Sequence, residues 1–246
     1  MTVTAAGSGR QSTELRAAAG PAQRTLGTVT LIGLGCGIFV VGVLSRLAMF
    51  LLIQLNPTVR GVTSDDGFVM GQFTLSGSLN LALLAGPVFG IVGAGFYLAL
   101  RGLAVGPRWF RLLSLSLGPG VVIGAIIVHT KGVDFTMLDP LWLAVALFVL
   151  VPTVYVALLH VLAERALAGP PWPRWVTRVG IAVWLPLLPG LLALVAGWTV
   201  LKALRRSETG SALLAHPVPS WVVRGALAVI FLYSVLDIVS DVRRLI

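Results

Sequence analysis

The stretch TVTLIGLGCGIFVVGVLSRLAMFLLIQL, residues 28–55, decides the class of fold. It is 28 residues long and contains one charged side chain, Arg46. About 20 apolar residues are enough for a helix to cross the hydrocarbon core of a bilayer. A signal peptide has a shorter apolar region, of about 7–15 residues, followed by a small-residue cleavage site. We therefore interpret residues 28–55 as a retained first membrane span.

Similar apolar runs recur along the rest of the chain, at residues 74–100, 112–130, 141–162, 179–201 and 221–240. The composition agrees, because 57% of the 246 residues are hydrophobic and only 11% are charged. Soluble domains have about 25% charged residues, so a soluble globular fold, a nucleic-acid-binding module and a disordered chain are excluded. The sequence predicts an all-α, polytopic transmembrane helical bundle of about six spans. Residues 26–246 form its single domain, and residues 1–25 form a disordered cytoplasmic tail.

Small residues recur at four-residue spacing in three of these spans. They are Gly33 and Gly37 in the first span, Gly86, Gly90 and Ala94 in the second, and Gly120 and Gly124 in the third. This spacing lets helix backbones approach closely in lipid. We expect it to serve packing within the chain rather than a dimer face. The sequence does not indicate an oligomeric state.

Basic residues predict the orientation in the cell membrane. The chain has 18 Lys and Arg against nine Asp and Glu, a net charge of +9. We attribute this excess to insertion and to anionic lipid head groups, since Lys and Arg collect in cytoplasmic loops. Loops 101–111 and 163–178 are richer in arginine than loops 56–68 and 130–140. The N-terminus is therefore predicted to be cytoplasmic, with loops 56–68 and 130–140 outside.

The segment 179–201 leaves two topologies open. It contains Pro186 and Pro189, and two prolines three residues apart interrupt the backbone hydrogen bonds of a helix. We favour a full crossing, which places the C-terminus in the cytoplasm but exposes the basic residues of loop 202–220 outside. The alternative is a re-entrant hairpin, which places the C-terminus outside.

Arg46 is the most informative ionisable residue because it lies inside the first span. A central arginine costs roughly 2.5–3.5 kcal/mol on insertion scales, and the surrounding apolar residues return more than this. Its side chain either snorkels to the head groups or needs a partner inside the bundle. We expect it to bind an anionic group together with Lys131.

Other ionisable side chains are predicted to lie toward the same outer side, and four of them are candidate acids or bases. They are Asp65, Asp66, His129 and Asp134. Adjacent carboxylates can raise one another's pKa, and a histidine beside an aspartate is suited to proton transfer. The alternatives are structural: Asp65 and Asp66 as a solvated turn, and His129 as an interfacial surface residue. Asp139 before Pro140 is typical of an N-cap for the fourth span.

No metal or other cofactor is expected. Cys36 is the single cysteine, and no zinc or iron–sulfur motif accompanies it. His129 and His160 fall near opposite faces of the membrane, so they do not hold one haem between them. His160 and Glu164 are four residues apart and share a helix face, either solvating a helix end or forming a proton-handling pair.

Three functions agree with these features. The first is a membrane enzyme that acts by acid–base chemistry on a membrane lipid or isoprenoid at the outer leaflet. The second is a permease subunit driven by a separate ATPase partner, since the chain lacks a nucleotide-binding motif. This permease predicts a polar path along Gln72, Thr74, Ser76, Ser78 and Asn80. The third is an assembly subunit without a site.

Overall fold

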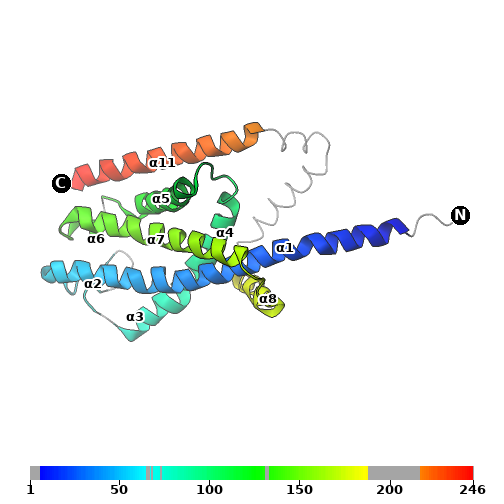
Figure 1. Cartoon of the computed structure of the whole chain (residues 1–246). Helices are drawn as coiled ribbons and strands as arrows, with labels where there is room; N and C mark the ends of the chain where they lie inside the picture. Colours follow the sequence, from blue (N-terminus) through cyan, green and yellow to red (C-terminus); the bar gives the residue numbers. More distant parts are fainter. Residues whose placement is uncertain are drawn as a thin grey trace.

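The structure is a computed structural model, and it describes residues 6–64, 67, 69–72, 74–130, 133–187 and 217–245. Within these ranges side chains are described from Gly20 onward, except those of residues 133, 134, 187 and 217. The described part is helical and contains no strand, only one isolated bridge between Thr63 and Val69. The predicted all-α fold is confirmed (Figure 1).

The main helices are long and connected by short loops. The first runs without interruption through α1 (Ala6–Cys36), η1 (Gly37–Leu44) and α2 (Ser45–Leu55), and the second through α3 (Leu75–Asn80), η3 (Leu81–Ala85) and α4 (Gly86–Leu100). The others are α5 (Arg108–Ile127), α7 (Leu141–Ala168) and α11 (Pro217–Leu245). The short elements are η2 (Pro57–Val59), α6 (Val133–Thr136), α8 (Arg174–Ala182) and η4 (Leu185–Leu187).

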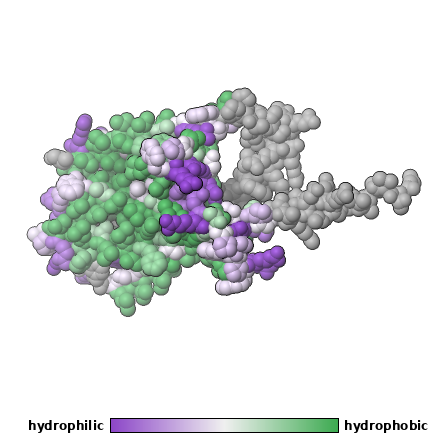
Figure 2. Space-filling model, viewed as in Figure 1, coloured by the Kyte–Doolittle hydropathy of each residue, from purple (hydrophilic) through white to green (hydrophobic). Residues whose placement is uncertain are grey.

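Five helices in the described ranges are long and apolar enough to cross a membrane. They cover residues 20–55, 75–100, 108–127, 141–168 and 218–245, close to five of the six predicted spans. Their outer faces are apolar, as the exposures of Phe39 (72%) and Ile126 (75%) illustrate. Figure 2 shows the result as a broad hydrophobic band with hydrophilic residues at both ends. This is the surface expected of a bundle whose solvent is lipid.

The bundle has two ends, and each takes its name from the topology that the sequence predicts. The predicted outer end consists of loops 56–74 and 128–140. The predicted cytoplasmic end consists of loops 101–107 and 169–173. Figure 1 places these two sets of loops at opposite ends of the long helices.

Glycine contacts hold the first two long helices together. A Cβ atom at Gly37 would overlap the carbonyl oxygen of Gly86, and one at Gly90 would overlap that of Gly33. The side chain of Ala94 faces Gly33 at the same interface. Only glycine permits this backbone contact, so the predicted packing of these small residues within the chain is confirmed.

The other long helices pack around this pair. Tyr155 on α7 is buried and donates a hydrogen bond of 2.7 Å to the carbonyl oxygen of Gly90. On α5, Gly120 faces Thr153 and Gly124 faces Val149, both on α7. The third span therefore uses its small residues within the chain as well.

The two loops of the predicted outer end are tied together by Asn56. Its buried amide donates to the carbonyl oxygens of Leu52 (2.9 Å) and Asp139 (2.7 Å), and its Oδ1 accepts from the backbone N–H of Asp139 (2.9 Å). The helix α7 begins after Pro140, and no side chain caps it. The predicted N-cap role of Asp139 is therefore wrong, because the backbone of Asp139 serves the loop contact instead.

The backbone of the predicted tail is helical from Ala6 onward, because α1 begins there. Its sequence includes Ala17, Ala18 and Ala19, and alanine has the highest helix propensity of all residues.

The direction of α11 differs from the favoured topology. Near its start Arg224 donates a hydrogen bond to the carbonyl oxygen of Leu103, at the predicted cytoplasmic end. Further along, Ile238 lies beside Gly124 and Leu245 packs against the apolar cluster of Val128 and its neighbours. The helix α11 therefore ends at the predicted outer end, opposite the N-terminus (Figure 1). A full crossing by residues 179–201 would reverse this direction, so the arrangement agrees with the re-entrant alternative; residues 188–216 lie outside the described residues.

Candidate functional site

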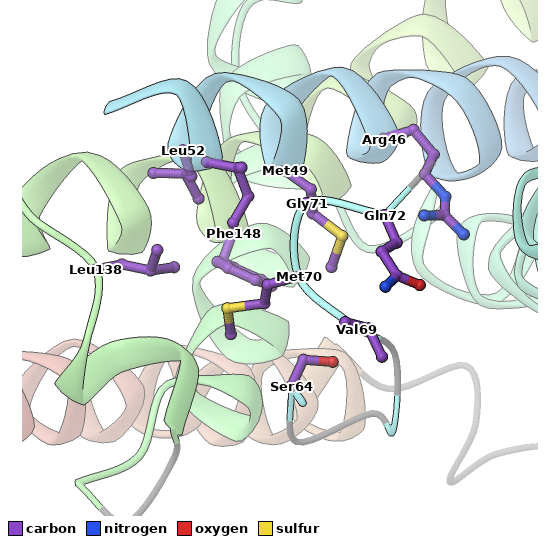
Figure 3. Close-up of a pocket in the computed structure, with 11 residues that line it drawn as sticks. Arg46, Met49, Leu52, Ser64, Val69, Met70, Gly71, Gln72, Leu138 and Phe148 are labelled. Atoms are coloured by element: carbon purple, nitrogen blue, oxygen red, sulfur yellow. The ribbon is translucent and has the colours of Figure 1, made fainter. Parts of the chain in front are cut away.

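A small cavity lies at the predicted outer end, between α2, α7 and the loop that follows η2. Its volume is about 60 Å³. Figure 3 shows Arg46 and Gln72 on one side, and Met49, Leu52, Phe148 and Leu138 on the other. The remaining lining residues are Ile53, Ser64, Val69, Met70 and Gly71.

The loop between η2 and α3 folds into a short hairpin that forms one wall of this cavity. The backbone N–H of Met70 donates to the carbonyl oxygen of Val62 (2.8 Å), and the N–H of Gly61 donates to that of Met70 (2.9 Å). Gly61 and Gly71 have positive φ angles, a conformation that other residues adopt at a cost. Met70 and Ser64 are buried as a result and face the cavity.

Arg46 reaches this cavity from the first turn of α2, on the face that is directed toward α3. It is half-buried, and a Cβ atom at Gly77 would lie 2.8 Å from its Nη2 atom. The guanidinium group therefore packs against the first turn of α3, where Thr74 accepts a hydrogen bond of 3.2 Å from the N–H of Gly77. The cavity thus has a cationic end and an apolar end.

The other predicted site residues are not shown at this cavity. Asp65, Asp66 and Lys131 lie outside the described residues, as does the side chain of Asp134. His129 is described and exposed: its Nδ1 is 2.8 Å from the carbonyl oxygen of Ile127, and its ring lies against Phe135. The cavity lining does not include it. Ser64, which directly precedes Asp65, is the part of the predicted acidic turn that the structure places there.

The polar stretch of the second span lies at the surface. Thr74, Ser76 and Asn80 are exposed, and Ser78 is half-buried. Gln72 is exposed as well and contributes to the cavity.

A second polar cluster lies at the predicted cytoplasmic end, centred on Tyr97 of α4. Its buried hydroxyl group donates to Glu164 Oε1 (3.2 Å) and lies 3.0 Å from His160 Nδ1, both on α7. Because the one hydroxyl hydrogen goes to Glu164, His160 donates from Nδ1 to the tyrosine oxygen. Arg101 completes the cluster, with its Nη2 atom 3.5 Å from Glu164 Oε1.

The pairing of His160 with Glu164 on one helix face is visible in the sequence, but the parts played by Tyr97 and Arg101 are not. Tyr97 lies in an apolar run, where an aromatic residue is usually interpreted as core. The available signal is that Tyr97 and Arg101 are also four residues apart, at the matching end of a neighbouring span.

The described residues form a bundle of apolar helices that is compatible with a membrane protein and carries polar groups at both ends. Among the described residues, no three His, Cys, Asp or Glu side chains are grouped as metal ligands. Comparisons with protein-family models, curated proteins and solved structures give no match to this chain.

Proposed function

We propose that this membrane protein binds a small anionic amphiphile at its predicted outer end, with Arg46 holding the anionic group. The observation that carries the proposal is the polarity of the cavity in Figure 3, which has a guanidinium group at one end and Met49, Leu52 and Phe148 at the other. An amphiphile has the same division between a charged head and an apolar chain. Arginine pairs with carboxylate or phosphate through two parallel hydrogen bonds.

The volume of the cavity limits what enters it. A buried water needs roughly 10–15 Å³ of such space, so about 60 Å³ admits a head group of a few heavy atoms. A carboxylate suits this space better than a bulky phosphodiester does. The apolar chain then lies against the exposed hydrophobic face of the bundle, where Phe50 and Leu51 on α2 are each 44% exposed.

Asp65 and Asp66 are the first candidates for acid–base chemistry on the bound amphiphile. Ser64 lines the cavity and is followed directly by these two carboxylates. His129 is directed to backbone and to Phe135 instead, so we do not assign it a catalytic role. The enzyme hypothesis therefore depends on Asp65 and Asp66, together with Asp134, the third predicted carboxylate at this end.

The binding proposal is supported better than a permease with a separate ATPase partner. A permease needs a polar route through the bundle, and the polar residues of the second span are largely exposed at its surface.

Native mass spectrometry of the purified full chain in detergent tests the proposal, with oleate and oleyl alcohol as probes. These two amphiphiles have the same hydrocarbon chain, and only oleate is charged. We expect the wild-type protein to retain oleate preferentially and Arg46→Gln to weaken oleate binding about tenfold, since a hydrogen bond to a charged group contributes roughly 1.5–3 kcal/mol.

Arg60→Gln is the matched control, because Arg60 is exposed at the same end and hydrogen-bonds to Gln54 outside the cavity lining. Equal retention of both probes by the wild-type protein, or an equal loss in Arg60→Gln, would overturn the proposal. If the wild-type protein converts a bound amphiphile to a product, loss of that conversion in Asp65→Asn or Asp66→Asn, with oleate binding intact, would indicate that these carboxylates act in a reaction.

A further inference from the structure

A second and larger cavity opens at the predicted cytoplasmic end, between α1, α4 and α7. Its volume is about 380 Å³. Two arginines from different helices line it, Arg24 on α1 and Arg101 after α4. The other lining residues are Gly20, Pro21, Thr25 and Leu167, and none of them is acidic.

Arg101 is held in place by the cluster around Tyr97. Its Nη2 atom pairs with Glu164 at 3.5 Å, and Glu164 in turn accepts from the Tyr97 hydroxyl group. The second terminal nitrogen, Nη1, is buried and has no hydrogen-bond partner within the described part of the chain. A buried N–H group without a partner costs roughly 1–3 kcal/mol, so this position favours an acceptor that the described residues do not provide.

Arg24 is also fixed, and its contacts with the described residues use only part of its donors. Its Nη2 atom donates to the carbonyl oxygen of Gly169 at 3.0 Å, which ties α1 to the end of α7. A guanidinium group has five N–H donors, so this hydrogen bond leaves several for a ligand. Thr25 uses its hydroxyl group on the carbonyl oxygen of Pro21. The cavity therefore presents two oriented cations.

The balance of charge at this cavity is positive. Arg24 and Arg101 line it, and among the described side chains Glu164 is the acid that pairs with Arg101. The Glu164 side chain is 51% exposed and also accepts a hydrogen bond from Tyr97. Arg111 on α5 lies within electrostatic reach of His160 in the same cluster. In Figure 2 hydrophilic residues gather at this end of the hydrophobic band, which is the level of lipid head groups in a membrane.

We infer that Arg24 and Arg101 form a binding site for a phosphate group, supplied by an anionic phospholipid or by free phosphate. Two guanidinium groups match the geometry of phosphate oxygens, and basic pockets between membrane helices bind anionic lipid head groups. The volume suits a glycerophosphate head group, in contrast to the smaller cavity beside Arg46. This inference is independent of the proposed function, because the two sites lie at opposite ends of the bundle.

The test compares phosphatidylglycerol with phosphatidylcholine, which share the phosphodiester but differ in net charge. The full chain is reconstituted in nanodiscs containing both lipids, released into detergent, and its retained lipids are counted by native mass spectrometry. We expect the wild-type protein to retain phosphatidylglycerol preferentially, and Arg24→Gln to reduce its retention about tenfold. Arg108→Gln is the control, because Arg108 is exposed at the same end and does not line the cavity.

Additional measurements identify the source of the phosphate and distinguish this cavity from the one beside Arg46. Competition by millimolar inorganic phosphate would assign the site to a free anion, and no competition would assign it to the lipid. Glu164→Gln releases Arg101 from its carboxylate partner, so it should raise retention severalfold. Arg46→Gln should leave phosphatidylglycerol retention unchanged, which separates this inference from the oleate experiment.

Two outcomes overturn the inference. One is a wild-type protein that neither prefers phosphatidylglycerol nor binds inorganic phosphate. The other is an equal loss of retention in Arg24→Gln and Arg108→Gln, which would show that phosphatidylglycerol is attracted by the basic charge of this end in general and not by the cavity. Thermal denaturation of each variant shows whether a loss of binding comes from unfolding.

Discussion

Among single residues, Tyr97 links polar side chains of two neighbouring helices, α4 and α7. Its hydroxyl group connects His160 and Glu164, and through Glu164 it orients Arg101. Only 3% of Tyr97 is exposed, so water does not replace these contacts when the hydroxyl group is removed. Its contribution can be measured by deleting one oxygen atom.

We predict that Tyr97→Phe lowers the free energy of unfolding by about 1–2 kcal/mol, because His160 Nδ1 loses its acceptor and Glu164 loses a donor. Unfolding by sodium dodecyl sulfate in mixed micelles measures this change. Tyr233→Phe is the control, since Tyr233 on α11 is 69% exposed and should change stability little. Equal midpoints for the two variants would show that the hydroxyl contacts of Tyr97 contribute nothing.

Sequence reasoning identified residues of the candidate site unevenly, for a physical reason. Arg46 stood out because a charge inside an apolar run is costly, and the structure places it on a cavity. His129 is predicted at the same end from its position in the chain. In the structure its ring contacts Ile127 and Phe135, and it does not line this cavity. Whether Arg46 binds a ligand stays a prediction.

At the scale of helices, glycine spacing identified the packing faces correctly. Glycine at every fourth position forms a flat stripe along a helix, and two such stripes allow backbone contact that dispersion forces stabilise. Gly33 and Gly37 meet Gly86 and Gly90 in this way, whereas Gly35, on the opposite face, has no atom within 4 Å of its Cβ position. The four-residue spacing of glycines in the sequence therefore predicts which glycines lie at a helix contact.

We predict that Gly37→Ala lowers the free energy of unfolding by about 1–3 kcal/mol, because the added methyl group would overlap the carbonyl oxygen of Gly86. Gly35→Ala adds the same methyl group to the same helix in open space. It should leave stability unchanged or raise it slightly, since alanine has the higher helix propensity. Detergent-resistant folded yield and the unfolding midpoint measure both variants. Similar losses in the two variants would contradict close packing at Gly37.

For the whole molecule, the sequence predicted five of the spans well because their lengths and compositions are unambiguous. It did not determine the direction of the last helix. That direction depends on whether residues 179–201 cross. The apolar length of this segment favours a crossing, whereas its two prolines and the basic loop that follows favour a re-entrant hairpin. The contacts of Arg224 and Ile238 place the end of α11 beside the predicted outer loops.

This direction moves Arg243 and Arg244 to the predicted outer end. The distribution of charge still favours the predicted orientation, because most described arginines stay at the other end. Those arginines are Arg24, Arg101, Arg108, Arg111, Arg165, Arg174, Arg178 and Arg224. The N-terminus is therefore still expected in the cytoplasm, with the C-terminus now outside.

Labelling of engineered cysteines in intact cells tests this arrangement. Cys36 is the single cysteine and is buried, so Cys36→Ala provides a clean background. We predict that a membrane-impermeant maleimide labels Thr58→Cys and Arg244→Cys from outside, and Gly102→Cys only after permeabilisation. All three positions are exposed in the structure, so differences in labelling reflect sidedness and not burial.

Which of the three positions are labelled together is more informative than the side of the membrane on which each is labelled. If the whole bundle were inserted in the opposite orientation, Thr58 and Arg244 would still be labelled together, and Gly102 separately. Six full crossings would instead group Arg244 with Gly102. Because the direction of α11 follows from contacts within the chain, and the orientation follows from the loop charges, the experiment separates the two conclusions. Labelling of Arg244→Cys together with Gly102→Cys would show that the packing of α11 described above is wrong.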